Sequence, residues 1–399
     1  MADRSPLKVL ALLGGRFLGH AHPLAALFAA LRERQGGACE FELHLIPLSA
    51  GPTPPAATLL RCHTTFLHVH EDLAQPLARS RPIRDYCDLL AVQGLHDRGR
   101  QARLVQRVRS IIEASRAQLI LTDSLPCVPQ LAAQAGIPVT AIRSHALLQR
   151  SDGGMWRDVF LDEPLGQADI QRHRAVLRSF RDVLGLRDRD TEPVQGVDVL
   201  FYQCPTATPG FAGFDVRPKA ATSHVFFRLG SLPGRVPPRK GRTALLYVRD
   251  TARRDLLREI LHGVGVACEE LRDDEPSSRD LWNRELNAEL ILSHGGHGMV
   301  AAGLYQRTPH LVVADTDDRY TNGLRVERHN AGVCLDWRVA AAEPERDIRL
   351  ALSQLRRLAP ERSGLNQASV APVEAARAIL SWAFPSLGAD PANGMRGEP

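Results

Sequence analysis

The sequence predicts an α/β protein built from two doubly wound domains, and three observations support this class. Apolar runs typical of buried parallel strands alternate with helical segments, once from residue 7 and again from residue 243. A segment dense in proline, glycine and charge separates the two series. With 399 residues, of which 44% are hydrophobic, the chain is long enough for two or three ordinary domains.

These observations also predict where the chain divides. We expect an N-terminal domain over residues 1–231, a linker over 232–241 and a C-terminal domain over 242–384. The final segment, 385–399, is rich in Gly, Pro, Asp and Asn and is expected to be a flexible tail. Two α/β halves joined by one linker place the functional cleft between them.

The first series opens with an expected strand over Leu7–Leu13, a glycine-containing turn, and a helix from Pro23, a residue tolerated in a first helical turn. The spacing G-G-x-x-x-G in that turn is not the dinucleotide fingerprint, so no NAD cofactor is expected. Further strands are expected over 41–47, 118–123, 137–142 and 197–202, and helices over 81–112, 131–136 and much of 150–195.

The second series is organised around Leu290–Leu304, in which an apolar run ends at Ser293-His294 and three glycines follow within four residues. A strand, a tight turn and a helix start present unpaired backbone N–H groups to a phosphate. A plain strand-to-helix turn with a solvated histidine is the alternative. Flanking strands are expected over 243–248, 264–270, 310–314 and 332–335, and helices over 254–261, 278–286 and 322–330.

Composition excludes several functional classes. The formal charge of +5 comes almost wholly from arginine interleaved with acids, in an Ala/Arg/Leu-rich bias typical of a G+C-rich bacterial genome, so we expect no nucleic-acid partner. The seven cysteines form no C-x-x-C pair, which argues against a disulfide framework or zinc ribbon. Neither a signal peptide nor a membrane-spanning run is expected, and a cytoplasmic location follows.

A group of histidines, His63, His68 and His70, raises the question of a metal site. His68 and His70 would share one face of a strand, but a third ligand in a recognised spacing is missing, even with Cys62 nearby. We therefore expect a hydrogen-bonded or exposed histidine group and no metal.

From His294 to Gly332 the sequence resembles, without gaps, the donor-binding signature of inverting nucleotide-sugar glycosyltransferases of the GT-B fold, such as the macrolide, glycopeptide and plant secondary-metabolite enzymes. Upstream, Gly19-His20-Ala21-His22-Pro23 resembles the G-H-x-x-P motif of that family, and Leu121-Thr122-Asp123-Ser124 resembles its partner-acid strand end. The signature positions that match are His294, Gly295, Gly296, Gly298, Leu304, Pro309, Asp318, Asn322, Arg325 and Val326.

The resemblance implies two Rossmann-like domains facing across a cleft, the first binding an acceptor and the second a nucleotide-sugar donor. It implies that His20 is the general base and that Asp123 orients its ring. An imidazole, with an ordinary pKa near 6.5, is suited to act as a general base. His22 remains the competing base. The implied diphosphate site is His294, Gly295, Gly296, His297 and Gly298, and the implied sugar contacts are Asp318, Arg319 and Asn322.

No cofactor or metal is implied, only a UDP- or TDP-linked cosubstrate. The competing interpretation of Asp315-Thr316-Asp317 as a D-x-D metal motif fits less well, because the family's sugar-contacting acid falls on Asp318. The expected activity is therefore inverting, metal-independent transfer of a sugar to a hydroxyl of a small, natural-product-like acceptor. Neither the acceptor nor the donor is specified, and a homodimer is left open.

Departures from the family pattern keep two alternatives open. The family's Thr after the last glycine is Met299, its ribose-gripping Glu is Ala302, its Gln after the sugar-contacting Asp is Arg319 and its Gly before the conserved Pro is Arg307. One alternative is a catalytically silent GT-B protein that binds a ligand or assists a partner transferase. The other is a nucleotide-sugar hydrolase or epimerase on the same fold.

Overall fold

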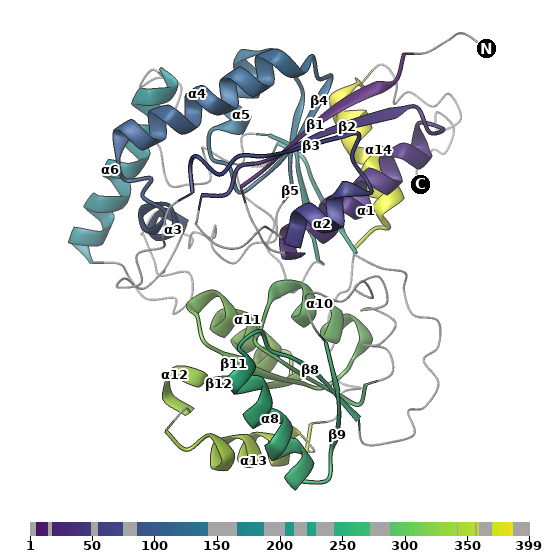
Figure 1. The fold of residues 1–399 in the computed structure, drawn as a ribbon, viewed down its shortest axis with the longest axis vertical. Coiled ribbons are helices and arrows are strands. Elements are labelled where there is room, and N and C mark those ends of the chain that lie inside the picture. The colour runs from purple at the N-terminus through teal and green to yellow at the C-terminus, as the bar shows by residue number, and fades with distance from the viewer. Residues whose placement is uncertain are drawn as a thin grey trace, which may run out of the picture.

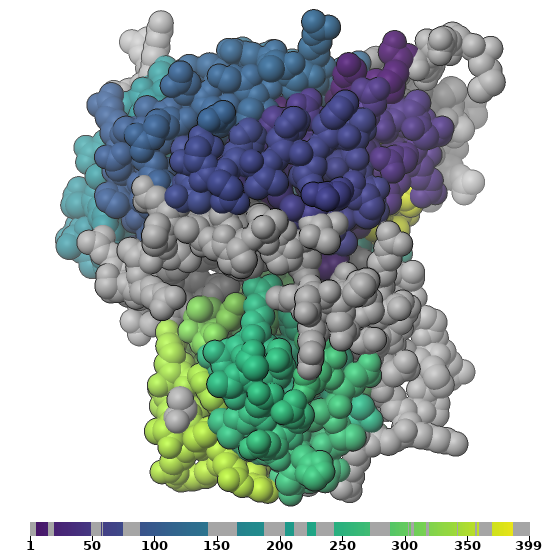
Figure 2. All heavy atoms as spheres, viewed as in Figure 1, coloured from purple at the N-terminus to yellow at the C-terminus, as the bar shows by residue number. Residues whose placement is uncertain are grey.

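The computed structural model describes residues 5–14, 18–48, 55–74, 86–142, 166–186, 204–210, 222–228, 243–271, 288–340, 342–355, 357–358 and 369–385. Over these ranges the chain forms two α/β units, each with a parallel sheet between helices (Figure 1). Figure 2 shows them as two lobes, the N-terminal one in purple to teal and the C-terminal one in green to yellow-green. The predicted fold class is confirmed.

The N-terminal sheet has the strand order β3-β2-β1-β4-β5-β6-β7, and every neighbouring pair is parallel. The chain runs outward from β1 to β3, then crosses to β4 and continues in the other direction. The order therefore reverses between β1 and β4, where doubly wound sheets bind ligands. The strands are β1 (Leu7–Leu13), β2 (Cys39–Leu45), β3 (Phe66–Val69), β4 (Leu119–Asp123), β5 (Val139–Ile142), β6 (Thr206–Pro209) and β7 (His224–Phe227).

Helices cover both faces of this sheet. Alternate side chains of β1 point to opposite faces, and both sets are buried: Leu10 and Leu12 on one face, Val9 and Ala11 on the other. The first face packs against α3 (Tyr86–Val92), α4 (Arg98–Ser115), α5 (Val128–Gln134) and α6 (Gln167–Leu184). The second packs against α1 (Leu18–Arg34), α2 (Pro55–Arg61) and α14 (Pro372–Ala383).

The C-terminal sheet has the order β12-β11-β10-β8-β9, also parallel throughout, and its order reverses between β8 and β10. Its strands are β8 (Thr243–Tyr247), β9 (Ala267–Glu270), β10 (Leu290–Ser293), β11 (His310–Ala314) and β12 (Gly332–Asp336). Helices α8 (Thr251–Gly263) and α13 (Pro344–Leu355) cover one face, and α10 (His297–Gln306) and α11 (Asp317–Arg328) cover the other. The short α12 (Trp337–Ala340) follows β12.

Helix α14 departs from the domain boundaries expected from the sequence, which placed it in 242–384. Its buried residues Ala375, Ala376 and Ile379 belong to the core formed with α1, and the yellow ribbon of α14 lies beside the purple α1 in Figure 1. Val370, just before the helix, forms a parallel bridge with Phe227 of β7. An amphipathic pattern says that a helix has an apolar face, but not which sheet receives it.

Other elements differ in their bounds. Helix α1 begins at Leu18 rather than at Pro23, which places Pro23 inside the helix. The helix expected over 81–112 is two helices separated by Gly94, whose φ of 76° ends the first. The strand predicted over 197–202, the helix over 278–286, the linker and the tail after residue 385 lie outside the described residues. Among the described helices, none is long and apolar enough to cross a membrane.

Candidate functional site

His20 and Asp123 meet at the point where the order of the N-terminal sheet reverses. His20 lies in the first turn of α1, which follows β1, and Asp123 is the last residue of β4. The Nδ1 atom of His20 and the Oδ2 atom of Asp123 are 2.6 Å apart. The His20 side chain is 31% exposed and that of Asp123 13%, so the histidine can reach solvent while the acid is largely enclosed.

The backbone around Asp123 fixes the direction of its carboxylate. In the parallel ladder Asp123 pairs with Leu13, and its carbonyl oxygen accepts a hydrogen bond from the Gly14 N–H at 2.9 Å. A Cβ at Gly14 would lie only 2.6 Å from the carbonyl oxygen of Ser124, so this close approach requires glycine. The Ser124 hydroxyl donates to the Asp123 Oδ1 at 2.9 Å, and both carboxylate oxygens therefore accept hydrogen bonds.

This geometry selects one tautomer of His20. An ionised carboxylate only accepts hydrogen bonds, so the Nδ1–H of His20 donates to Asp123, and Nε2 is the ring nitrogen that carries the lone pair. His22, the competing base, lies two residues further along α1, which turns its side chain about 200° around the helix axis from that of His20. Of these two rings, His20 is the one hydrogen-bonded to Asp123.

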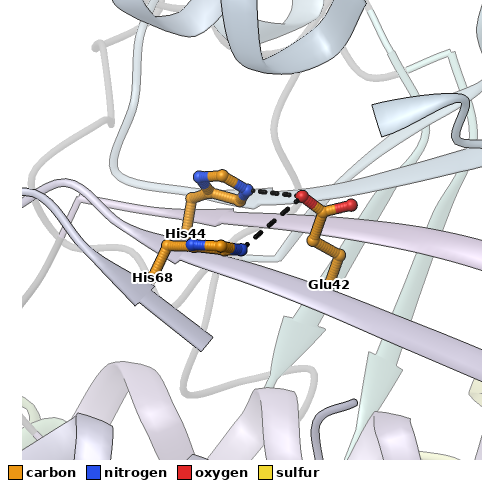
Figure 3. A group of neighbouring side chains, drawn as sticks. All are labelled: Glu42, His44 and His68. Carbon is orange, nitrogen blue, oxygen red and sulfur yellow. Dashed lines mark hydrogen bonds and ion pairs between the residues drawn. The ribbon is translucent and has the colours of Figure 1, made fainter. Parts of the chain in front are cut away.

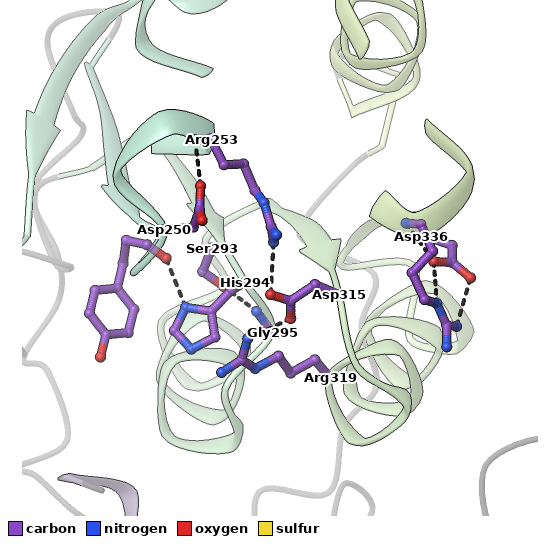
Figure 4. A network of polar contacts seen from close by, with 10 residues as sticks. Asp250, Arg253, Ser293, His294, Gly295, Asp315, Arg319 and Asp336 are labelled. Atoms are coloured by element: carbon purple, nitrogen blue, oxygen red, sulfur yellow. Dashed lines mark hydrogen bonds and ion pairs between the residues drawn. The ribbon is translucent and has the colours of Figure 1, made fainter. Parts of the chain in front are cut away.

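A second candidate site lies at the corresponding point of the C-terminal sheet. His294 follows β10, and both its backbone N–H and its Nδ1–H donate to the carbonyl oxygen of Tyr247 on β8 at 3.2 Å. These bonds join the two strands between which the sheet order reverses. Figure 4 shows His294, Gly295, Arg319, Asp315 and Arg253 gathered at this end of the sheet.

The turn after His294 has a backbone that only glycine adopts comfortably. Gly295 has a φ of 85°, and a Cβ there would lie 2.7 Å from Val312 Cγ1 and 2.8 Å from the carbonyl oxygen of Arg319. The Ser293 hydroxyl accepts from the Gly295 N–H at 3.1 Å, and the Asn322 amide donates to the Gly295 carbonyl oxygen at 3.0 Å. The sequence therefore places a rigid turn directly before α10.

The first turn of α10 has the properties of an anion site. Its N-cap, Gly296, provides no side-chain cap, and the first intrahelical bond runs from the Val300 N–H to the Gly296 carbonyl oxygen. The N–H groups of His297, Gly298 and Met299 thus have no acceptor within the helix. Together with the positive end of the helix dipole they can bind a phosphate oxygen.

Two arginines surround His294 with positive charge. Burial, followed by the charges of Arg319 and Arg249, lowers the pKa of His294 to about 3, so its ring is neutral at physiological pH. Asp315 partly balances this charge, because one of its oxygens accepts from Arg319 and the other from Arg253 at 2.9 Å. Burial alone would raise the pKa of Asp315, but Arg319 and Arg253 hold it below its usual value.

The overall fold is shared with solved structures. No family model and no curated protein matches the sequence. The calicheamicin glycosyltransferase is similar with a TM-score of 0.61 at 15% identity, over 95% of this chain and 99% of that chain. A kitacinnamycin "glycotransferase" gives 0.60 at 15% identity, over 95% and 100%. A glycosyltransferase of Streptomyces sp. SF2575, complexed with thymidine diphosphate, gives 0.52 at 18% identity, over 94% and 99%.

The chain has the GT-B fold. The predicted resemblance is confirmed at the level of architecture, and the two candidate sites lie at the two reversal points of the GT-B sheets. Among the predicted sugar contacts, Asn322 is 4% exposed and its amide anchors the glycine turn. Arg319 pairs with Asp315, and the side chain of Asp318 lies outside the described residues. Their contacts with a sugar stay predictions.

The departures from the GT-B signature now have physical explanations in two places. Met299 is 4% exposed and packs with Leu245 and Ile291, so its side chain belongs to the core. Arg307 caps the end of α10 with a φ of 55°, which explains why glycine suits this position better. The Ala302 side chain lies outside the described residues.

Sequence reasoning missed three contributors to these sites: Ser124, Tyr247 and Arg253. Tyr247 acts through its carbonyl oxygen, which no side-chain pattern reveals. Arg253 is 62 positions from Asp315, and only the fold brings the two together. Ser124 directly follows Asp123, the predicted acid, and has a φ of 62°. The sequence Asp-Ser does not predict this left-handed backbone conformation.

Replacing Gly295 with alanine is expected to destabilise the protein by about 2–4 kcal/mol, because the left-handed backbone and two close contacts both oppose a Cβ. Chemical denaturation of the variant measures this loss. The matched control is Gly298→Ala, where a Cβ meets nothing within 4 Å, and a change within about 1 kcal/mol is expected there. Equal losses in the two variants would show that the turn at Gly295 is not constrained as described.

Proposed function

We propose that this protein is an inverting, metal-independent glycosyltransferase that moves a sugar from a UDP- or TDP-linked donor to a hydroxyl group of a small-molecule acceptor. The observation that carries the proposal is the 2.6 Å His20–Asp123 pair at the carboxyl ends of β1 and β4. The His20–Asp123 pair lies where the strand order of the N-terminal sheet reverses, and the turn proposed to bind phosphate lies where the order of the C-terminal sheet reverses. A base and a leaving-group site are the two parts that glycosyl transfer requires.

In the proposed reaction His20 Nε2 removes the proton of the acceptor hydroxyl while Asp123 stabilises the resulting imidazolium. The acceptor oxygen forms a bond to the anomeric carbon, and the bond from that carbon to the diphosphate oxygen breaks. Attack from the face opposite the leaving group inverts the configuration. The products are the glycoside, the nucleoside diphosphate and a proton held on His20.

The leaving diphosphate is assigned to the turn formed by His294 to Gly298. Backbone N–H groups at the start of α10 stabilise the charge that develops on the departing oxygen. Because His294 donates its Nδ1–H to Tyr247 and is neutral, it becomes a second donor only when Nε2 takes up a proton. A bound diphosphate favours that protonation, since a nearby negative charge raises an imidazole pKa.

A panel of UDP- and TDP-sugars, with and without a mixture of hydroxylated aromatic and macrocyclic acceptors, tests the proposal. We expect acceptor-dependent release of the nucleoside diphosphate and a product of inverted anomeric configuration, observed by NMR. Release without any acceptor would instead indicate a hydrolase. Measurements after exhaustive chelation test metal independence, and a loss of turnover there that added Mg²⁺ restores would contradict it.

A catalytically silent GT-B binding protein is the second candidate. The burial of Met299 favours it, because the family's threonine hydroxyl is replaced by an apolar side chain that faces the core. Calorimetric titration with UDP and TDP separates the candidates. Binding accompanied by turnover supports the transferase, whereas binding of neither nucleotide supports the silent protein.

Arg319 is proposed to contact the donor phosphates through the part of its guanidinium not used by Asp315. Arg319→Gln is expected to weaken UDP or TDP binding about three- to tenfold, since a charge-assisted hydrogen bond is lost. The effect should be larger at low salt. The matched control is Arg328→Gln, an exposed arginine in the last turn of the same helix. Unchanged affinity in Arg319→Gln would limit Arg319 to neutralising Asp315.

A further inference from the structure

A group of histidine and glutamate side chains lies on β2 and β3, at the edge of the N-terminal sheet farthest from β7. The sequence repeats a pattern of alternate polar residues there: Glu42-Leu43-His44 on β2 and His68-Val69-His70 at the end of β3. In the parallel register His44 pairs with His68. Because alternate residues share a face of a strand, this register brings Glu42, His44 and His68 together.

The contacts among these side chains are short (Figure 3). His44 Nε2 lies 2.8 Å from Glu42 Oε1, and His68 Nε2 lies 3.9 Å from the same oxygen. One atom from each of the three side chains can be chosen so that all lie within 4.8 Å of one another. The rings of His44 and His68 stack with centroids 4.4 Å apart, and the Nε2 atoms of both are directed towards Glu42 Oε1 (Figure 3).

We propose that Glu42, His44 and His68 form a binding site for a divalent transition metal ion of the Zn²⁺ type. Two imidazoles and one carboxylate are a ligand set that suits such ions, and a solvent molecule would complete the coordination. Ligand atoms at about 2.0–2.2 Å from a metal lie about 3.3 Å from one another in a tetrahedral arrangement. Separations of 2.8 and 3.9 Å bracket this value, so small side-chain rotations bring the atoms into position.

The surroundings also suit a metal. His70 Nε2 lies 2.8 Å from His44 Nδ1, so His70 can accept the Nδ1–H and hold His44 with its Nε2 towards the metal.

This site is separate from the proposed chemistry, and it combines His68 with Glu42 and His44 in place of His63 and His70, the histidines grouped with it in the sequence analysis. Within the described chain the strand order reverses between β1 and β4, whereas β3 is the outer strand of the sheet. That strand has four residues and exposes Phe66 (58%) and Val69 (40%). A metal bridging β2 and β3 would hold this short strand in place and stabilise the folded state by mass action.

The test uses the full chain, stripped with EDTA and dialysed, with ZnCl₂ and CoCl₂ as probes. We expect one Zn²⁺ per chain by calorimetry, a rise in melting temperature with Zn²⁺, and Co²⁺ absorption bands of a nitrogen- and oxygen-ligated ion. Mg²⁺ should produce none of these effects, because it prefers oxygen ligands. Absence of stoichiometric Zn²⁺ binding, or equal effects of Mg²⁺, would overturn the proposal.

Variants decide whether these side chains are the ligands. His68→Ala and Glu42→Gln are expected to weaken Zn²⁺ binding at least tenfold and to abolish the rise in melting temperature. His68 is 49% exposed, so its removal leaves the fold intact even where the buried His44 cannot be changed. His262→Ala, in the exposed part of α8, is the control. Binding retained in His68→Ala but lost in Cys62→Ser would assign the metal to the exposed thiol and contradict the site.

Discussion

Replacing His20 with alanine is expected to reduce the rate of glycosyl transfer about 10²- to 10⁴-fold, the contribution usual for a positioned general base. The physical reason is the tautomer fixed by Asp123, which leaves Nε2 as the proton acceptor. Initial rates of nucleoside diphosphate release measure the effect. Because the His20 side chain is 31% exposed, the melting temperature should change little.

Asp123→Asn provides the companion test, since an amide keeps the shape of the side chain but cannot stabilise the imidazolium. We expect a loss similar to that of His20→Ala, and the double variant should lose little more, because the two residues act as a unit. The matched control is His22→Ala, the second histidine of the same helix, with activity close to that of the unchanged protein. Full turnover in His20→Ala, or a larger loss in His22→Ala, would overturn the assignment of the base.

The second large effect is expected in the acid stability of the protein. His294 and His310 are 4% and 0% exposed, and burial is the main cause that lowers the pKa of each to about 3. In the unfolded chain both rings titrate near 6.5. Below pH 6.5 the two imidazoles therefore bind protons in the unfolded state, whereas in the folded state they remain neutral down to about pH 3. The free energy of unfolding falls as the pH falls through this range.

Each such histidine contributes a slope of up to about 1.4 kcal/mol per pH unit, and half of that at pH 6.5, so the pair should cost about 3 kcal/mol between pH 6.5 and 5. That is a large share of the about 5–15 kcal/mol typical of a folded domain. Urea unfolding at several pH values measures the slope. His310→Gln should lower the slope by up to about 1.4 kcal/mol per pH unit, whatever its effect on the stability at pH 7. A flat profile in the unchanged protein would contradict the argument.

Much of this fold could be predicted because its strands are buried on both faces. Val9–Leu13 and Leu311–Ala314 are continuous apolar runs, and the structure places them in β1 (Leu7–Leu13) and β11 (His310–Ala314), the bounds expected from the sequence. The glycine turn after His294 could also be predicted. A φ of 85° and the lack of room for a Cβ both require glycine at position 295. Local constraints of this kind appear directly in the sequence.

Features that depend on distant contacts could not be predicted. The pairing of Asp315 with Arg253, 62 positions away, depends on the sheet order that brings the start of α8 near the end of β11, and the arginine-rich composition hides which arginines matter. The proximity of His44 to His68 could not be predicted, because His44 lies in β2, 24 positions before His68, and only the strand register joins them. The short strands β6 and β7, of four residues each, are too brief for a periodic signal.

The position of α14 has a consequence for how this protein folds as it is synthesised. The backbone N–H of Arg228 bonds to the carbonyl oxygen of Val370, and its guanidinium bonds to the carbonyl oxygen of Ser369, 141 positions away. At about 5–20 residues per second, a ribosome needs about 7–28 s to cover that distance. During this interval the apolar face of α1, which later packs against Ala375 and Ile379, has no native cover from α14. Of the two domains, the one that is synthesised first is thus the last to be completed.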